Sequence, residues 1–483
     1  MTITVLSVAS ECWPLVKTGG LADVVGALPA AVEPSGVEMT RFLPGYPAVM
    51  KALGRKRIVH KYDSLLGAPA RIIAAKHDDR PLLVLDAPAY YDRDGGPYSD
   101  AMGWDWMDNG LRFAALARAA ADVAAGLTSA KPFDILHAHD WQAGLAPAYL
   151  IHATDSPHIP KTVQTIHNMA FQGAFAADFF GRLGLPPRAF AIDGVEYHGG
   201  VGFLKAGLRL ADAITTVSPT YAEEIRRPEF GMGLEGLIVG RQDRLHGIVN
   251  GIDPEQWNPA TDPALAASYN ADTLDARAAN KRAIEAAFGL EPGEGPLFVV
   301  ISRLTWQKGM DVLIEVLDHL VGLGGRLALL GSGDAAIEAG LHAAAGRHPG
   351  RIGIRTGYDE ALSHRMQGGG DAILVPSRFE PCGLTQLYGL AYGCVPVVAR
   401  TGGLADTVID ANLAALNADA ATGFLFSPVN YEGLSQAITR VVRLHGDQAS
   451  WRRIQRRGMA ADFTWARSGA AYAELYAQLK EQP

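Results

Sequence analysis

Short apolar runs alternate with longer segments of helical periodicity along the whole chain. In the first half, the apolar runs predict buried strands, and segments such as 109–125 and the one that begins near residue 21 predict helices. The predicted strands of this half cover residues 2–9, 82–85, 134–138, 161–166 and 213–217. Because apolar strands that alternate with helices form parallel sheets covered on both faces, this half is predicted to be a doubly wound α/β domain.

The second half repeats this alternation. Its predicted strands cover residues 297–302, 326–330, 352–355, 372–376 and 395–399, and its predicted helices cover residues 310–323, 335–347 and 384–392. Between the halves lies a segment rich in turn residues, 248–259 (IVNGIDPEQWNP). Since a chain of 483 residues is longer than the roughly 250–300 at which one hydrophobic core stops growing, we predict two domains, residues 1–247 and 248–459.

Composition and charge exclude several classes of protein. The chain is 48% hydrophobic and 19% charged, which excludes a disordered protein, and its net charge of −8 argues against a nucleic-acid binder. Three scattered cysteines, Cys12, Cys382 and Cys394, are too few for a disulfide framework or a cysteine-based zinc site. No apolar run approaches the ~18–20 residues that span a bilayer, and the apolar start lacks the basic region of a secretory signal. We therefore expect a cytoplasmic protein that binds neither nucleic acid nor membrane.

One sequence element occurs twice. Residues 18–25 read TGGLADVV and residues 401–408 read TGGLADTV, so that seven of eight positions match. Both copies follow a predicted loop and open a predicted helix. A Gly-Gly pair at a helix start bares backbone N–H groups, which predicts an anion-binding helix end in each half. The alternative is a chance resemblance between two glycine-rich turns.

Three further motifs allow other chemistries. Residues 231–236 (GMGLEG) match the dinucleotide-binding fingerprint but follow a predicted helix instead of a strand. Residues 331–336 (GSGDAA) follow a strand, which keeps a nicotinamide-dependent enzyme open, although an ordinary tight turn is favoured. His137 and His139 share one face of a strand and could bind a metal. Since no further histidine stands directly after them, polar ligand contacts by the neighbouring Asp140 are favoured.

Two cations follow the predicted strand 297–302. Arg303 and Lys308 bracket a loop at the carboxyl end of this strand, where open α/β sheets bind their ligands. Two cations beside a helix start suit a diphosphate. A surface salt bridge is the alternative.

Four other side chains follow predicted strands or loops in the same way. Glu380 precedes a proline, which favours extended backbone and places a carboxylate that could hold sugar hydroxyls or cap the next helix. Thr385 could cap that helix or contact a phosphate. His167 ends the strand 161–166, and Lys17 adds a cation before the first Gly-Gly pair.

Together these motifs resemble the bacterial glycogen synthases, which use ADP-glucose and are related to plant starch synthases. The resemblance covers nearly the whole chain. Its longest motifs are KTGGLADVVGALP, HAHDWQAGLAP, HGIVNGIDPEQWNP, SRLTWQKG and SRFEPCGLTQLYGLAYG. It implies the GT-B architecture, in which two Rossmann-like domains face a central cleft, and a C-terminal segment, residues 460–483, whose helix crosses back to the first domain.

The same resemblance implies an activity. Such enzymes transfer glucose from ADP-glucose to the non-reducing end of an α-1,4-glucan such as glycogen, with retention of configuration, with release of ADP and without a metal or other cofactor. Domain closure over the substrates is expected, because the implied site residues come from both halves.

The resemblance also implies roles for individual residues. The implied catalytic residues are Glu380, Arg303, Lys308 and His167, and the implied donor-binding residues are Lys17, Gly20, Asp23, Asp140, Asn250, Tyr358, Cys382, Gly383 and Thr385. Arg303 and Lys308 would neutralise the diphosphate, and Tyr358 would stack on the adenine. Wider GT-B relatives often carry a second glutamate where this chain has Tyr388, so a role that needs paired glutamates is not expected.

Three alternatives stay open on the sequence. A glucan phosphorylase of the same fold would need a lysine that carries pyridoxal phosphate. A non-catalytic protein could keep the fold and only bind glucan. A nicotinamide-dependent dehydrogenase is the third.

Overall fold

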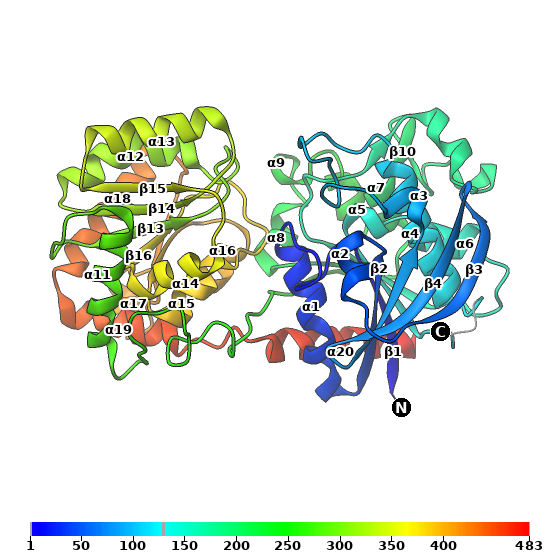
Figure 1. Ribbon diagram of the computed structural model, residues 1–483, viewed down its shortest axis with the longest axis horizontal. Helices are drawn as coiled ribbons and strands as arrows, with labels where there is room; N and C mark the ends of the chain where they lie inside the picture. The colour runs from blue at the N-terminus through cyan, green and yellow to red at the C-terminus, as the bar shows by residue number, and fades with distance from the viewer. Residues whose placement is uncertain (1, 128–130, 483) are drawn as a thin grey trace. The chain divides into compact units, whose positions relative to one another are not determined.

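The computed structural model of the protein describes residues 2–127 and 131–482. It consists of two compact units (Figure 1), of which unit 1 comprises Met1–Asn250 and Trp465–Pro483, and unit 2 comprises Gly251–Thr464. Each unit has its own sheet and its own buried core. No helix of the described residues is long and apolar enough to cross a membrane.

Unit 1 is built on a nine-stranded sheet with the order β12-β11-β7-β6-β1-β2-β5-β4-β3. The strands are β1 (Ile3–Val8), β2 (Val37–Pro44), β3 (Arg57–Leu65), β4 (Ala68–His77), β5 (Arg80–Asp86), β6 (Ile135–His139), β7 (Lys161–Ile166), β11 (Ala213–Thr216) and β12 (Leu245–Gly247). A small separate sheet contains β8 (Ala174–Phe175), β9 (Glu196–Tyr197) and β10 (Gly200–Gly202). The central strands are parallel, with Val5 opposite Ile135 and Val37 opposite Ile3.

Helices cover this sheet on both faces. They are α1 (Gly20–Val32), α2 (Pro47–Ala52), α3 (Pro88–Tyr91), α4 (Asn109–Ala124), α5 (Asp140–Ala143), α6 (Ala146–His152), α7 (Phe203–Leu210), α8 (Pro219–Glu224), α9 (Pro228–Gly231), α10 (Glu235–Val239) and α20 (Trp465–Glu481). The alanine-rich α4 is buried along nearly its whole length, so its polar Arg112 is held by backbone carbonyls such as Tyr90 O, at 2.8 Å. The terminal α20 packs on α1 through Tyr472 and Tyr476, in a core that also contains Val5.

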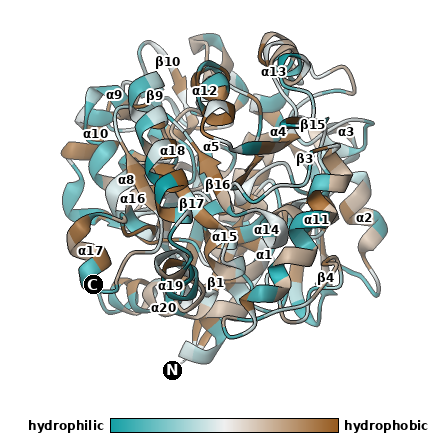
Figure 2. Cartoon of the chain, turned by 90° about the vertical axis from the view of Figure 1, so that its left-hand side faces the viewer, coloured by the Kyte–Doolittle hydropathy of each residue, from teal (hydrophilic) through white to brown (hydrophobic). Residues whose placement is uncertain are grey.

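Unit 2 has a six-stranded parallel sheet with the order β15-β14-β13-β16-β17-β18. Its strands are β13 (Leu297–Ile301), β14 (Arg326–Gly331), β15 (Ile352–Thr356), β16 (Ala372–Val375), β17 (Val395–Ala399) and β18 (Phe424–Phe426). Its helices are α11 (Arg277–Phe288), α12 (Met310–Gly322), α13 (Ala335–Arg347), α14 (Glu360–Gly369), α15 (Thr385–Tyr392), α16 (Gly402–Thr407), α17 (Leu413–Asn417), α18 (Tyr431–His445) and α19 (Gln448–Met459). The amphipathic α18 buries Leu434, Ile438 and Val441, and its hydrophilic residues are teal in Figure 2. The predicted α/β class with two doubly wound, Rossmann-like halves is confirmed.

The sheet of unit 1 departs from the predicted parallel pattern at one edge. β3 and β4 form an antiparallel hairpin whose turn residues, Leu66 and Gly67, have φ of 50° and 101°. A two-residue turn with two positive φ values matches the twist of an antiparallel pair. These strands were not predicted, because β3 is largely exposed and carries mixed polar and apolar residues.

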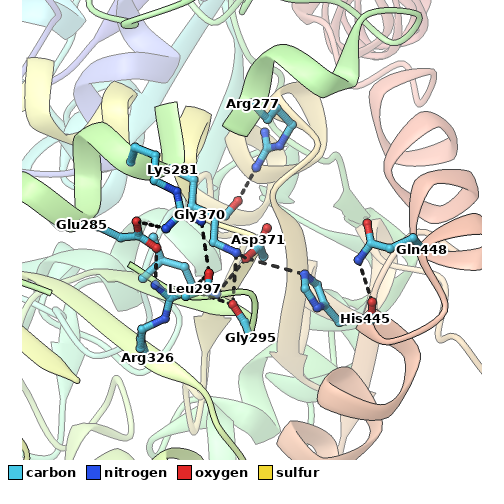
Figure 3. A network of polar contacts seen from close by, with 12 residues as sticks. Arg277, Lys281, Glu285, Gly295, Leu297, Arg326, Gly370, Asp371, His445 and Gln448 are labelled. Carbon is cyan, nitrogen blue, oxygen red and sulfur yellow. Dashed lines mark hydrogen bonds and ion pairs between the residues drawn. The ribbon is translucent and has the colours of Figure 1, made fainter. Parts of the chain in front are cut away.

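A buried polar network fixes α11 to the sheet of unit 2 (Figure 3). The carboxylate of Asp371 accepts a hydrogen bond of 2.8 Å from the Leu297 N–H and pairs with Lys281 Nζ at 2.7 Å and His445 Nε2 at 3.7 Å. Alongside it, Arg326 pairs with Glu285 and donates to backbone carbonyls. One carboxylate therefore joins a strand, a helix and the end of α18.

Replacing Asp371 by asparagine should lower the free energy of unfolding by about 3 kcal/mol at neutral pH, because the Lys281 ammonium loses its counter-charge. Burial alone would raise the pKa of Asp371, but the nearby His445 imidazole and the charge of Lys281 hold that pKa below the ordinary 3.8. The contribution of ionised Asp371 to the free energy of unfolding is therefore fully present above about pH 4 and is lost as the pH falls further. Urea unfolding at several pH values should show the difference from wild type narrowing below about pH 4.

The matched control is Asp318→Asn, because Asp318 pairs with Arg347 and His348 at an exposed position. This change should have little effect on the free energy of unfolding at any of these pH values. Equal destabilisation by the two changes would contradict the prediction.

Candidate functional site

Three neighbouring strands of unit 1 end in polar residues at the same edge of the sheet. β1, β6 and β7 lie side by side in parallel, so their carboxyl ends share one edge. Glu11 follows β1, Asp140 follows β6 and His167 follows β7. Two of these side chains, Asp140 and His167, are sequence-predicted site residues, and the third was missed.

Glu11 organises the loop that precedes α1. Its buried carboxylate accepts hydrogen bonds from the Thr18 N–H, from Thr18 Oγ at 2.6 Å and from the Gly19 N–H at 3.3 Å, and also from the Tyr98 hydroxyl. The prediction that the Gly-Gly pair bares its N–H groups is thus wrong for Gly19, because a carboxylate of the chain already binds that N–H. A Cβ at Gly19 would meet nothing within 4 Å, so the backbone there stays open to close approach.

The two other predicted residues of this loop pair with each other. Lys17 Nζ lies 2.8 Å from Asp23 Oδ1, and both side chains are partly exposed. Gly20 is the first residue of α1. Lys17, Gly20 and Asp23 are therefore together, as predicted, with the lysine held by the first turn of the helix.

The second Gly-Gly pair serves a different purpose. A Cβ at Gly402 would lie 2.0 Å from the Glu380 carbonyl oxygen, and one at Gly403 would lie 2.2 Å from that of Cys382. The Gly403 N–H donates to the Glu380 and Pro381 carbonyls, each at 3.2 Å. The prediction of an anion-binding helix end is wrong for this N–H, because these glycines allow α16 to pack on the Glu380 loop.

A chain of histidines runs behind the edge residue His167. His139 Nδ1 lies 3.0 Å from His167 Nε2, and His139 Nε2 lies 3.1 Å from Ser7 Oγ. His137 contacts Tyr476 and Thr165 hydroxyls. Both ring nitrogens of His137 and of His139 have hydrogen-bond partners, which leaves no lone pair for the metal alternative. Burial lowers the pKa of His167 to about 3, so this imidazole is neutral and acts by hydrogen bonding.

Asp140 is held in a strained backbone conformation with φ of 53°. Its carboxylate accepts a hydrogen bond of 2.6 Å from the His167 N–H, which ties β6 to β7. Burial raises the pKa of Asp140 to about 7, against the lowering effect of backbone hydrogen bonds from His167 and Asn168. The strain and the raised pKa mark this carboxylate as part of a functional site.

In unit 2, Lys308, Glu380 and Ser377 form a compact cluster. Lys308 Nζ lies 2.5 Å from Glu380 Oε2, and Ser377 Oγ donates to the same oxygen at 2.8 Å. Glu380 does not cap the next helix, because Leu384 occupies the N-cap position and no side chain caps α15. The capping alternative for Glu380 and for Thr385, the first residue of α15, is therefore wrong.

Arg303 is placed differently from Lys308. It is exposed, and its side chain makes no ion pair or hydrogen bond within residues 2–127 and 131–482. The salt-bridge alternative is wrong for Arg303, whereas Lys308 does pair with Glu380. An unpaired guanidinium beyond a parallel strand remains available for an anionic ligand.

The remaining predicted residues differ in exposure. The ring of Tyr358 is 71% exposed, and its hydroxyl contacts Glu360. Cys382 is buried, and Gly383 has φ of 73°, which favours glycine. Asn250 is buried, and its Oδ1 has no hydrogen-bond partner among the described residues, so this acceptor is available to a ligand.

Neither of the two glycine-rich motifs has the structure of a dinucleotide-binding loop. Residues 231–236 run from the last residue of α9 into the first turn of α10, so a helix and not a strand directly precedes them. Cβ atoms at Gly331 and Gly333 would lie 2.0 and 2.4 Å from the carbonyl oxygens of Ser302 and Leu304. These glycines therefore pack the β14 turn against the Arg303 loop, as the tight-turn interpretation predicts.

Sequence reasoning missed Glu11, Ser377 and Tyr98. The sequence carried a signal for two of them. Glu11 follows the apolar run 2–9, in the half that contains His167, and Ser377 follows the apolar run 372–376, in the half that contains Glu380. Tyr98 lies in an irregular loop, and its contact with Glu11 spans 87 residues of sequence.

Comparison with known proteins identifies the family. The model of the starch synthase catalytic domain matches residues 4–240, and that of glycosyl transferases group 1 matches residues 281–457. The chain is 68% identical over 481 residues to a glycogen synthase of Novosphingobium aromaticivorans and 59% identical over 479 residues to glycogen synthase 1 of Rhizobium meliloti, with 99% of each chain covered in both cases. The catalytic domain of starch synthase IV from Arabidopsis thaliana, solved with ADP and acarbose, matches with a TM-score of 0.90 at 30% identity and covers 100% of both chains. The chain therefore belongs to the glycogen synthase family of glycosyltransferases, which includes the starch synthases.

Proposed function

We propose that the protein transfers glucose from ADP-glucose to the non-reducing end of an α-1,4-glucan such as glycogen, with retention of configuration and release of ADP. The observation that carries this proposal is the pair of cations beyond β13, the unpaired Arg303 and the glutamate-bound Lys308. The names of the relatives, and the ADP and acarbose bound to the starch synthase neighbour, support the choice of donor and acceptor.

The leaving group of this reaction is ADP, and its departure determines the role of these residues. When the bond between glucose C1 and the β-phosphate oxygen breaks, negative charge develops on ADP. Arg303 and Lys308 would stabilise that charge, and Thr385 would add a hydrogen bond. Two cations can do this without a divalent metal, so we propose a reaction that needs no metal or other cofactor.

The acceptor hydroxyl would attack glucose C1 on the face that ADP leaves. Attack on that face retains the configuration, and the proton of the acceptor hydroxyl would pass to the departing phosphate, which balances the charge. Glu380 is bound by Lys308 and Ser377, which suits a residue that orients glucose hydroxyls better than a free nucleophile. A covalent glucosyl-protein trapped during turnover would contradict this mechanism.

The other predicted residues would hold the donor and acceptor. Tyr358 would stack on the adenine, and Cys382 and Gly383 would line the glucose pocket. The loop of Lys17, Gly20 and Asp23 would contact the donor, while Asp140, His167 and Asn250 would contact glucose and acceptor. We also propose a cytoplasmic location, as expected from the sequence.

The test is a donor comparison with the full chain. ADP-glucose or UDP-glucose is mixed with glycogen, with or without EDTA, and nucleotide release and glucan growth are followed. We expect faster release from ADP-glucose and no effect of EDTA. Phosphate-dependent release of glucose 1-phosphate with a pyridoxal absorption band would favour a phosphorylase instead, and glycogen binding without transfer would favour a non-catalytic protein.

A further inference from the structure

A line of three hydrogen-bonded side chains crosses the sheet of unit 1 and ends at His167. Ser7 lies on β1, His139 is the last residue of β6 and His167 follows β7, and these three strands are neighbours in the sheet. Ser7 Oγ lies 3.1 Å from His139 Nε2, and His139 Nδ1 lies 3.0 Å from His167 Nε2. Ser7 and His139 are completely buried, whereas His167 is half-buried. The line therefore connects the interior of the sheet with a residue of the candidate site.

Each hydrogen bond of this line has two possible directions, because a neutral imidazole donates from one ring nitrogen and accepts at the other. Burial lowers the pKa of His139 well below the ordinary 6.5 and that of His167 to about 3, so both rings are neutral. If Ser7 donates to His139 Nε2, then His139 donates from Nδ1 and His167 accepts at Nε2. If Ser7 accepts instead, both bonds reverse.

The surroundings of Ser7 determine which direction holds. Its hydroxyl makes no second hydrogen bond with any residue that the structure describes. A hydroxyl that accepted from His139 would leave its own hydrogen buried without an acceptor, which costs more free energy than an unfilled lone pair on the same oxygen. The Ser7 hydroxyl therefore donates, and it follows that His139 and His167 both carry their proton on Nδ1.

The neighbouring imidazole of His137 follows the same rule with the opposite result. It packs against His139, with ring centres 4.1 Å apart. The buried hydroxyl of Tyr476, on α20, lies 2.7 Å from His137 Nδ1 and has no second hydrogen-bond partner in the described part of the chain. This hydroxyl donates, so His137 carries its proton on Nε2 and donates to Thr165 Oγ1. Two adjacent histidines thus receive different tautomers from two hydroxyls, and only the hydrogen bonds of His139 reach His167.

We propose that Ser7 and His139 are positioning residues, which fix His167 in the tautomer that offers an Nδ1–H donor to a ligand. His167 Nδ1 makes no hydrogen bond with the described residues, so its N–H is available. The importance of this donor for activity rests on the proposed function, in which the ligand atom is an oxygen of glucose or of the acceptor. Since Nε2 is occupied by His139, neither ring nitrogen can take the proton of the acceptor hydroxyl. This tautomer therefore agrees with transfer of that proton to the departing phosphate.

The tautomers can be measured in the full wild-type chain without substrate. NMR of protein that contains nitrogen-15-labelled histidine distinguishes a protonated ring nitrogen from an unprotonated one, and the signals missing from His139→Gln and His167→Asn assign the two residues. We expect a proton on Nδ1 and none on Nε2 in both residues. A proton on Nε2 of His167 would overturn the proposal.

Activity variants test whether His139 acts through His167. His139→Leu removes both hydrogen bonds, so kcat for glucose transfer should fall roughly fivefold to tenfold, the effect of one lost hydrogen bond. The NMR signals of His167 should then show a mixture of tautomers. His139→Gln should recover part of the rate, because its amide can accept from Ser7 and donate to His167. Equal losses of kcat in His139→Leu and His139→Gln would contradict the proposal.

The matched control is His137→Leu, which removes an equally buried imidazole with two hydrogen bonds that do not reach His167. It should lower the melting temperature about as much as His139→Leu, but it should keep the Nδ1–H tautomer of His167 and nearly the wild-type kcat. A loss of kcat as large as that of His139→Leu would show that packing and not the tautomer matters, and would overturn the proposal. If the wild-type chain transfers no glucose, the proposed function fails, while the NMR measurement still decides the tautomer of His167.

Discussion

Lys308→Ala should reduce kcat for glucose transfer by roughly 10²–10³-fold, the loss that follows removal of one group that stabilises developing negative charge. The ammonium is fixed by its contact of 2.5 Å with Glu380, so it needs no reorganisation when ADP begins to leave. The measurement is initial ADP release at saturating ADP-glucose and glycogen. Binding of glycogen should persist, which separates this enzyme from a protein that only binds glucan.

Two comparisons make this prediction sharper. Arg443→Ala removes an exposed cation of α18 that makes no ion pair within the described residues, and it should leave kcat unchanged. Lys308→Arg keeps the positive charge but changes its shape, and it should recover part of the lost rate. Wild-type kcat in Lys308→Ala would show that charge stabilisation does not depend on this residue.

The rule that ligands bind at the carboxyl ends of parallel strands explains most of what the sequence could predict. It selected Arg303 and Lys308 beyond β13, Glu380 beyond β16 and His167 beyond β7. These positions can be inferred from local pattern, because an apolar run followed by polar residues marks both the strand and its end.

The partners of these residues could not be inferred in the same way. The contact of Glu11 with Tyr98 and that of Lys308 with Glu380 join segments that are 87 and 72 residues apart in sequence. Such pairs depend on how loops meet after the sheet has formed, and a single sequence carries no local signal for them. The edge hairpin of β3 and β4 was missed for a related reason, since its register depends on the turn at Leu66 and Gly67 and not on an apolar run.

The repeated TGGLAD element shows how far identical residues can differ in role. At Gly19 a side chain would meet open space, whereas at Gly402 it would collide with the Glu380 carbonyl. The first copy keeps the backbone accessible beside Glu11 and Lys17. The second copy instead positions the backbone of the Glu380 loop, which makes it a support for the cluster of unit 2.

Glu380→Gln should lower kcat by at least about 10²-fold, because it removes a charge from the cluster that orients Lys308. The amide keeps the size of the side chain and can still accept the hydrogen bond from Ser377, but it no longer neutralises the mostly buried ammonium. We therefore expect two effects together: slower ADP release at saturating substrates and a lower melting temperature. Glu380→Asp, which keeps the charge on a shorter side chain, should melt closer to wild type while kcat stays low.

Ser377→Ala separates charge from positioning in this cluster. It removes one neutral donor to Glu380 Oε2 and leaves the ion pair with Lys308 in place, so it should cost about 1 kcal/mol, or roughly fivefold in rate. Adding ADP should raise the melting temperature of Ser377→Ala as much as that of wild type, whereas the increase should differ in Glu380→Gln, where Lys308 has lost its partner. If Ser377→Ala and Glu380→Gln lose equal amounts of activity, the hydrogen bond and not the charge of Glu380 determines the rate, and the role assigned to the Lys308–Glu380 pair is wrong.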